Sequence, residues 1–91
     1  MIKNEREYLE FIQSKGVGSN DRVASSPASY ISYLNSVSEI LGTDITPSRL
    51  RSEADISFII KEIEGERSPK TIRNYRTAMR QYIGFVTELG L

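Results

Sequence analysis

The apolar residues of this chain recur every three or four positions, as they do on one face of a helix. No stretch alternates apolar and polar residues for long enough to predict a strand, so the pattern predicts an all-α protein. A first helix is expected over residues 3–14 and a polar loop over residues 16–22. The apolar positions of this helix are Tyr8, Leu9, Phe11 and Ile12.

Two later helices are predicted to begin with the same pair of residues, a serine followed by a proline. A serine hydroxyl accepts a hydrogen bond from a free backbone N–H of the first helical turn, and a proline at the first position has no N–H to leave unpaired. Ser26-Pro27 therefore predicts a helix that ends at Gly42. Ser68-Pro69 predicts a longer helix that ends at Gly90.

Two further starting signals lie between these helices. Thr46-Pro47 predicts a short turn that reaches Arg51. Ser52 then offers another cap, with Asp55 three residues later in an acidic version of the capping box. The helix that begins there is expected to end at Gly65. Its predicted core positions are Ile56, Ile59, Ile60 and Ile63.

The two serine-proline helices also resemble each other along their length. Tyr33 aligns with Tyr75, 42 positions later, and Val37 aligns with Met79 at the same offset. Because a shorter helix precedes each of them, the pattern predicts a pair of helical hairpins. Two helices that share common capping chemistry by chance would give the same pattern, and the residues leave both explanations open.

The residue types that are absent exclude several classes of function. The chain has 91 residues, enough for one domain over residues 1–91, and it contains neither cysteine nor histidine. Without cysteine the chain cannot form a disulfide framework, and without histidine it lacks the usual general base for a serine or cysteine nucleophile and most transition-metal sites. We therefore expect no catalysis, no metal and no cofactor. The apolar runs are too short to cross a bilayer, which predicts a cytoplasmic protein with no membrane partner.

The charge is balanced overall but unevenly distributed. Twelve basic and twelve acidic residues give a net charge of zero. Residues 16–66 carry four basic residues against eight acidic ones, whereas residues 67–91 carry five basic residues against Glu88 alone. The basic charge is therefore concentrated in the last helix.

Arg73, Arg76 and Arg80 form a stripe along that helix, with Lys70 on the same exposed arc. A face that serves only solubility usually mixes charges of both signs, and no acidic residue interrupts this arc before Glu88. The stripe therefore predicts an anionic partner. The alternative is an ion-paired face, in which the arginines pair with acidic residues of the preceding helix. Those acidic residues are Glu62, Glu64 and Glu66.

A row of serines gives the second helix a different surface. Small hydroxyl side chains allow the close approach of a backbone and donate hydrogen bonds to phosphates. The helix starts at Ser26 and Ser68 also offer free N–H groups that suit a phosphate. An ordinary solvated face explains the serines equally well. The row consists of Ser25, Ser29, Ser32 and Ser36.

The last helix resembles a helix of a known family. Residues 68–86 open with Ser-x-x-Thr, continue to Asn74-Tyr75 and end in an aromatic and aliphatic cluster. This stretch is similar to the last helix of the core-binding domain of tyrosine recombinases, the phage-integrase type of site-specific recombinases. The resemblance covers residues 20–88. It implies a SAM-like bundle of four to five helices, arranged as two crossed hairpins.

The resemblance also implies a function. In this family the domain grips duplex DNA, while a separate C-terminal domain supplies arginines, a histidine and a tyrosine nucleophile. We therefore expect a non-catalytic DNA-binding domain of a recombinase or integrase whose parent protein carries a C-terminal catalytic domain. The alternative is a protein-interaction module that pairs acidic and basic faces, including by self-association. The residues assigned to DNA are Lys70, Thr71, Arg73, Asn74, Arg76, Thr77 and Arg80 of the last helix, and Ser25, Ser26 and Ser29 of the second.

Overall fold

The computed structural model describes residues 1–15 and 27–91, and this part of the chain is all-α, as the sequence predicts. Its elements are α1 (Glu5–Ser14), α2 (Pro27–Leu41), α3 (Glu53–Ile63), the 3-10 turn η2 (Glu64–Glu66) and α4 (Pro69–Leu89). The expected loop over residues 16–22 and the expected cap at Ser26 lie outside the described residues. None of the described helices combines the length and the apolar character that a membrane span requires.

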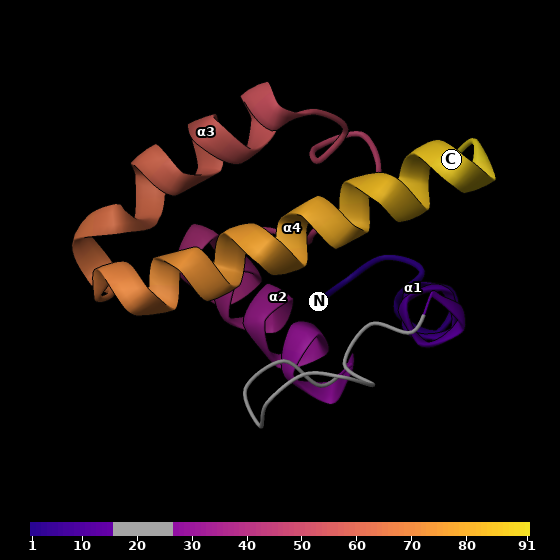
Figure 1. The fold of residues 1–91 in the computed structure, drawn as a ribbon. Helices are drawn as coiled ribbons and strands as arrows, with labels where there is room; N and C mark the ends of the chain where they lie inside the picture. Colours follow the sequence, from indigo (N-terminus) through magenta and orange to yellow (C-terminus); the bar gives the residue numbers. More distant parts are fainter. Residues whose placement is uncertain (16–26) are drawn as a thin grey trace.

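The helices are arranged around α4, which is the longest of them. Figure 1 shows α3 alongside α4, α2 crossing α4, and α1 near the C-terminal half of α4. The contact between α2 and α4 is the most extensive one, and α1 packs on both of these helices. The expected helical bundle is therefore confirmed. Its two hairpins are α1 with α2 and α3 with α4.

The residues that align at the offset of 42 positions meet where α2 crosses α4. The ring centroids of Tyr33 and Tyr75 lie 6.0 Å apart, and the two ring planes are inclined by 57°. One turn further along each helix, Val37 and Met79 are both fully buried. The two hairpins thus use equivalent positions to pack against each other.

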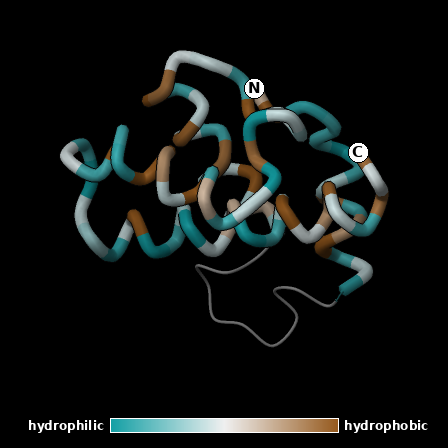
Figure 2. The backbone as a smooth tube through the Cα atoms, turned by 90° about the horizontal axis from the view of Figure 1, so that it is seen from above, coloured by the Kyte–Doolittle hydropathy of each residue, from teal (hydrophilic) through white to brown (hydrophobic). Residues whose placement is uncertain are grey.

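The core lies along a face of α4 that differs in part from the apolar positions that its helical spacing predicts. Those positions are Ile72, Tyr75, Met79, Tyr82, Ile83, Val86 and Leu89. Figure 2 shows hydrophobic positions along the middle of the bundle and hydrophilic positions along its outer turns. Phe85, which the pattern did not single out, is fully buried because α1 packs on it, with the rings of Tyr8 and Phe11 5.8 and 5.7 Å away. Leu89, a predicted apolar position, is exposed. The buried residues of α4 are Ile72, Tyr75, Ala78, Met79, Tyr82, Phe85 and Val86.

α3 begins as the sequence predicts. The Ser52 hydroxyl accepts a hydrogen bond from the Asp55 N–H at 3.4 Å, and the Asp55 carboxylate accepts one from the Ser52 N–H at 3.2 Å. The capping box is therefore confirmed, and all four predicted isoleucines of this helix are buried. At the other end, η2 continues the helical path past Gly65, so the helical turns end at Glu66.

The segment between α2 and α3 contains the predicted glycine end and the predicted short turn. Gly42 has a φ of 74°, in the left-handed region that glycine adopts at helix ends. The carbonyl of Thr46 then accepts hydrogen bonds from the N–H groups of Arg49 and Leu50, each at 3.1 Å. This segment forms a single helical turn. Leu50, at the end of the turn, is fully buried in the core.

The first residues pair with this same segment, which delays the start of α1. The Lys3 N–H donates to the Ile45 carbonyl at 2.8 Å, and the Ile45 N–H donates to the Met1 carbonyl at 2.9 Å. Asn4 then takes a left-handed conformation with a φ of 62°. α1 therefore begins at Glu5, two residues later than expected.

Candidate nucleic-acid interface

The candidate interface begins at the N-terminus of α4. The Ser68 hydroxyl accepts a hydrogen bond from the Thr71 N–H at 3.3 Å and donates one to Thr71 Oγ1 at 3.0 Å. With Pro69 at the first helical position, this cap fixes where the helix starts. Thr71 is half-buried, and its hydroxyl accepts the Ser68 hydrogen bond within this cap.

Three cations follow on the first two turns of α4. Lys70 and Arg73 are exposed, and Arg76 is half-buried. The ion pairs of the described residues include none of these three side chains. Their charges are therefore open to solvent or to an external anion. At the helix N-terminus, the free N–H groups and the helix dipole add to this positive field.

Arg80, the fourth member of the predicted stripe, differs from these three cations. Its guanidinium donates to both carboxylate oxygens of Glu53, with Nε to Oε2 at 3.1 Å and Nη2 to Oε1 at 3.2 Å. Glu53 lies at the start of α3, which runs back along α4 and so comes opposite Arg80. Both side chains of this ion pair are at least half exposed to solvent, so the pair contributes at most about 1 kcal/mol to stability.

The ion-paired alternative therefore applies to one arginine and involves a different acidic residue from those considered. Glu62, Glu64 and Glu66 are exposed, and no ion pair joins any of them to α4 within the described part of the chain. Glu88, the one acidic residue of α4, pairs with Lys15 at 2.9 Å. The uncompensated charge of α4 is thus confined to its N-terminal half.

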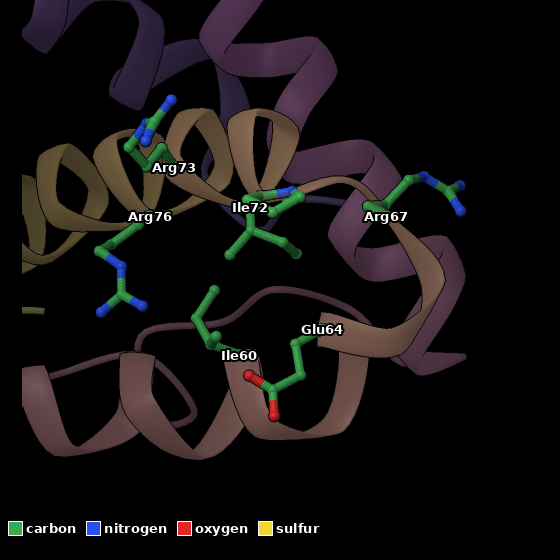
Figure 3. Close-up of a pocket in the computed structure, with 7 residues that line it drawn as sticks. Ile60, Glu64, Arg67, Ile72, Arg73 and Arg76 are labelled. Carbon is green, nitrogen blue, oxygen red and sulfur yellow. The ribbon is translucent and has the colours of Figure 1, made fainter.

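An open hollow of about 380 Å³ lies between α3 and this half of α4. Figure 3 shows Arg76 reaching from α4 toward α3, while Arg73 and Arg67 point away from the space between the helices. Ile60 and Ile72 are almost fully buried and form the apolar floor. The remaining lining residues are Pro69 and Glu64, so three arginines and one carboxylate border the hollow, and of the three arginines Arg76 reaches toward α3.

The polar neighbours of the cations are partly engaged within the helix. The Thr77 hydroxyl is exposed but donates to the Arg73 carbonyl at 3.1 Å. Asn74 is half-buried. These residues lie beside the cations as the sequence predicts, and their contact with DNA stays a prediction.

The serines of the second helix are only partly described. Ser25 and Ser26 lie outside the described residues. Ser29 is half-buried on α2, one turn before Tyr33, whose ring packs on Tyr75 of α4. Ser29 is therefore near the crossing of α2 and α4. Further along α2, Ser32 is exposed and Ser36 is half-buried.

The chemistry available at this surface is the binding of anions by arginine and lysine. No group of acidic side chains in the described residues is placed to hold a metal ion. Burial raises the pKa of Tyr82 to about 12 and also raises the pKa of Tyr8, to which the nearby Tyr30 and Tyr82 hydroxyls contribute. Both tyrosines lie in the core, where they donate hydrogen bonds to backbone carbonyl oxygens.

The sequence does not assign Arg67 to DNA, and it places Glu64 near the arginines only as one of three possible ion-pair partners. Both come before the helix whose pattern was analysed, and they join the site only because α3 and α4 fold back on each other. For Arg67 a signal existed, since this residue directly precedes the cap at Ser68 and belongs to the basic run. For Glu64, no local signal shows that it lines the hollow while Glu62 and Glu66 do not.

Comparison with known proteins provides no relative: no family model matches the chain, and neither a curated protein nor a solved structure matches it significantly. The resemblance to the core-binding domain of tyrosine recombinases stays a prediction from the residues.

Proposed function

We propose that this chain is a non-catalytic DNA-binding domain that grips the phosphates of duplex DNA with the N-terminal half of α4. The observation that carries the proposal is a group of neighbouring cations that have no acidic partner among the described residues: Lys70, Arg73 and Arg76, with Arg67 just before the helix. Phosphate contacts supply most of the affinity of non-specific DNA binding, and they require cations that are not already neutralised.

The number of free cations sets the expected salt dependence. Four cations that each neutralise one phosphate give a slope of log K against log salt of about −3 to −4. Arg80 is not counted because Glu53 already neutralises it. At physiological salt, we expect a dissociation constant of about 10⁻⁴ to 10⁻⁶ M and little preference for sequence.

The test is a fluorescence-polarisation titration of duplex DNA at several salt concentrations. The variant Lys70→Ala/Arg73→Ala/Arg76→Ala should bind about tenfold more weakly or worse at low salt, with a slope reduced by about three. The matched control, Lys3→Ala/Arg6→Ala/Lys61→Ala, removes the same charge from exposed side chains outside α4 and should retain most of the affinity. Equal losses in both variants, or no binding by the unmodified chain, would refute the proposal.

A second variant tests whether the interface extends along α4. Glu53→Gln removes the partner of Arg80 and leaves a free cation one turn beyond Arg76. If DNA reaches this part of the helix, the slope becomes steeper by about one. If the slope is unchanged, the interface is confined to the first two turns.

The finer proposal is that the domain belongs to a site-specific tyrosine recombinase or integrase that acts in the cytoplasm. It is supported by the resemblance of residues 68–86 and by the placement of the free cations on the helix that the resemblance assigns to DNA. The parent protein would then carry a C-terminal catalytic domain. Sequencing the reading frame beyond Leu91 tests this, because catalytic arginines, a histidine and a tyrosine are expected there.

The second candidate is a protein-interaction module in which acidic and basic faces pair between copies. It is favoured by the exposed acids Glu62, Glu64 and Glu66, which have no ion-pair partner within the described residues. Light scattering with the same triple α4 variant separates the two candidates. A stable dimer that is lost in this variant and is insensitive to DNA favours the interaction module.

A further inference from the structure

A second surface of α3 combines an exposed aromatic ring with an adjacent hollow. Phe58 is 68% exposed, more than any other large hydrophobic residue in the described helices. It borders a hollow of about 180 Å³ between α3, the end of α2 and the segment that follows α2. Leu41 and Ile59 provide apolar contact surface there. The ring and the hollow together form a projection beside a depression.

The rim of this hollow carries one charge of each sign. Arg49 and Glu62 both line it and are both exposed. Neither forms an ion pair within the described residues. The rim therefore offers both a cation and an anion, so each copy of this chain supplies the charge that the other requires. In a contact with two-fold symmetry, residue i of one copy meets residue j of the other, and residue j of the first copy meets residue i of the second.

We propose that this surface, the Phe58 patch, binds a second copy of this chain across a two-fold axis. The Phe58 ring of each copy lies against the hollow of the other, and Arg49 of each copy faces Glu62 of the other. The unpaired Arg49 and Glu62 favour this occupant over an unrelated protein, because each charge finds its opposite on the same patch of a second copy. The patch consists of Leu41, Thr43, Arg49, Phe58, Ile59 and Glu62.

The patch is separate from the candidate DNA interface. Ile60 of α3 and Glu64 of η2 line the arginine hollow beside α4, whereas Phe58 and Glu62 of α3 line the other hollow. A dimer formed through the Phe58 patch therefore leaves the cations of α4 exposed in both copies. The proposal does not depend on DNA binding, and its test contains no DNA.

The small number of residues in the patch predicts a weak dimer. Interfaces that bury less than about 1,200 Å² in total are typical of transient complexes. We expect a dissociation constant of about 0.1–1 mM, which sedimentation equilibrium of the full chain can measure at high concentration. Phe58→Ser should weaken this association about tenfold or more. Because Phe58 is largely exposed, the same variant should keep its thermal unfolding midpoint.

The decisive test exchanges the charges. Arg49→Glu and Glu62→Arg each place like charges at both ends of a symmetric contact, so each variant alone should associate about tenfold more weakly than the unmodified chain. In an equimolar mixture of the two variants, both contacts of a mixed dimer are again between opposite charges. The mixture should therefore associate more strongly than either variant alone.

The matched control applies the same charge changes outside the patch. Arg6→Glu and Glu10→Arg alter exposed residues of α1, and their mixture should gain no association over the separate variants. The proposal is overturned if the unmodified chain stays monomeric up to millimolar concentration, which would leave the patch to another protein. It is equally overturned if the mixture of Arg49→Glu and Glu62→Arg associates no more than its components.

Discussion

The two hairpins of this domain share their packing positions and differ in their surface chemistry. At the crossing, Tyr33 of α2 lies against Tyr75 of α4, its counterpart 42 positions later. Each hairpin also has a hollow beside the start of its second helix. Pro27 and Ile31 line the hollow between α1 and α2, and their counterparts Pro69 and Arg73 line the hollow between α3 and α4.

The lining of these equivalent hollows is of opposite character. Leu9, Ala28 and Ile31 make the first one largely apolar, whereas Arg67, Arg73 and Arg76 make the second one cationic. The buried positions of the two hairpins therefore keep similar chemistry, because both halves must pack against each other. The surface positions are free of this constraint, and they are where the candidate function lies.

The ends of the two second helices also differ. Gly42 ends α2 in a left-handed conformation, while Gly84, its counterpart, lies inside α4. α4 continues because Phe85 and Val86, directly after Gly84, are buried in the core. A glycine thus ends α2, whereas tertiary contacts of the following residues keep Gly84 helical within α4.

The largest expected effect concerns the crossing itself. Tyr75 is almost fully buried and Tyr33 is half-buried, so Tyr75→Ala should cost about 3–5 kcal/mol of unfolding free energy and Tyr33→Ala clearly less. The double variant should show a coupling of about 0.5–1.5 kcal/mol, because the two rings contact each other. Urea unfolding of the three variants measures this. Full additivity would mean that the hairpins do not meet through this pair.

The second prediction concerns pH and the contact of α1 with α4. The folded state raises the pKa of Tyr82 from about 10 to about 12 by burial, and it raises the pKa of Tyr8 as well. Because folding disfavours the ionised form, this contribution is fully present below pH 10 and is lost as the pH rises above it. Unfolding free energy should fall by up to about 1.4 kcal/mol per pH unit for each tyrosine.

Urea unfolding between pH 8 and pH 11 measures this slope. Tyr82→Phe removes one titrating hydroxyl, together with its hydrogen bond to the Lys3 carbonyl, and should flatten the profile above pH 10. An unchanged profile in this variant would assign the alkaline loss to other groups.

The third prediction converts the surface of α4 into that of α2. Lys70→Ala and Arg73→Ile install the residues found at the aligned positions Ala28 and Ile31. DNA affinity at low salt should fall about tenfold, with a salt slope smaller by about two, because two phosphate contacts are lost. Unfolding free energy should change by less than about 0.5 kcal/mol, since both replaced side chains are exposed. A large loss of stability instead would show that these positions serve packing.

The smallest expected effect is the change in stability when either of two glycines is replaced by alanine, and it has opposite signs at the two positions. Gly84→Ala should stabilise the domain by about 0.5–1 kcal/mol, because the new Cβ would lie 3.9 Å from the Phe11 ring, at ordinary contact distance, inside a helix. Gly42→Ala should destabilise it by about 1 kcal/mol or more, because alanine disfavours a φ of 74°. Thermal unfolding of both variants checks this. Equal signs would contradict the different roles of the two positions.

The sequence predicts those features of the fold that depend on neighbouring residues. The Ser52 and Asp55 capping box, the Ser68-Pro69 start and the four buried isoleucines of α3 follow from local hydrogen bonding and helical spacing. The start of α1 does not, because Lys3 pairs with the distant Ile45. The burial of Phe85 also escapes prediction, since it depends on α1 packing against the far end of α4.

In the candidate site, too, features that depend on neighbouring residues are predicted, and those that depend on tertiary contacts are not. The exposure of Lys70 and Arg73 follows from their place on the polar arc of an amphipathic helix. The pairing of Arg80 with Glu53 does not, because 27 residues separate them and only the antiparallel course of α3 and α4 brings them together. Whether a charge is paired depends on the tertiary fold. The stripe of unpaired cations on α4 is therefore shorter than the sequence predicts.

The hydrogen bond from the Tyr8 hydroxyl to the Ala78 carbonyl joins residues that are 70 positions apart. During synthesis at about 5–20 residues per second, Tyr8 therefore waits about 4–14 seconds for this partner to be made. α1 cannot complete its packing in that interval, because Phe85 is made later still. The nascent chain thus carries Tyr8 and Phe11 without their aromatic partners until α4 is complete, and this is the period in which a chaperone or a protease has access to them.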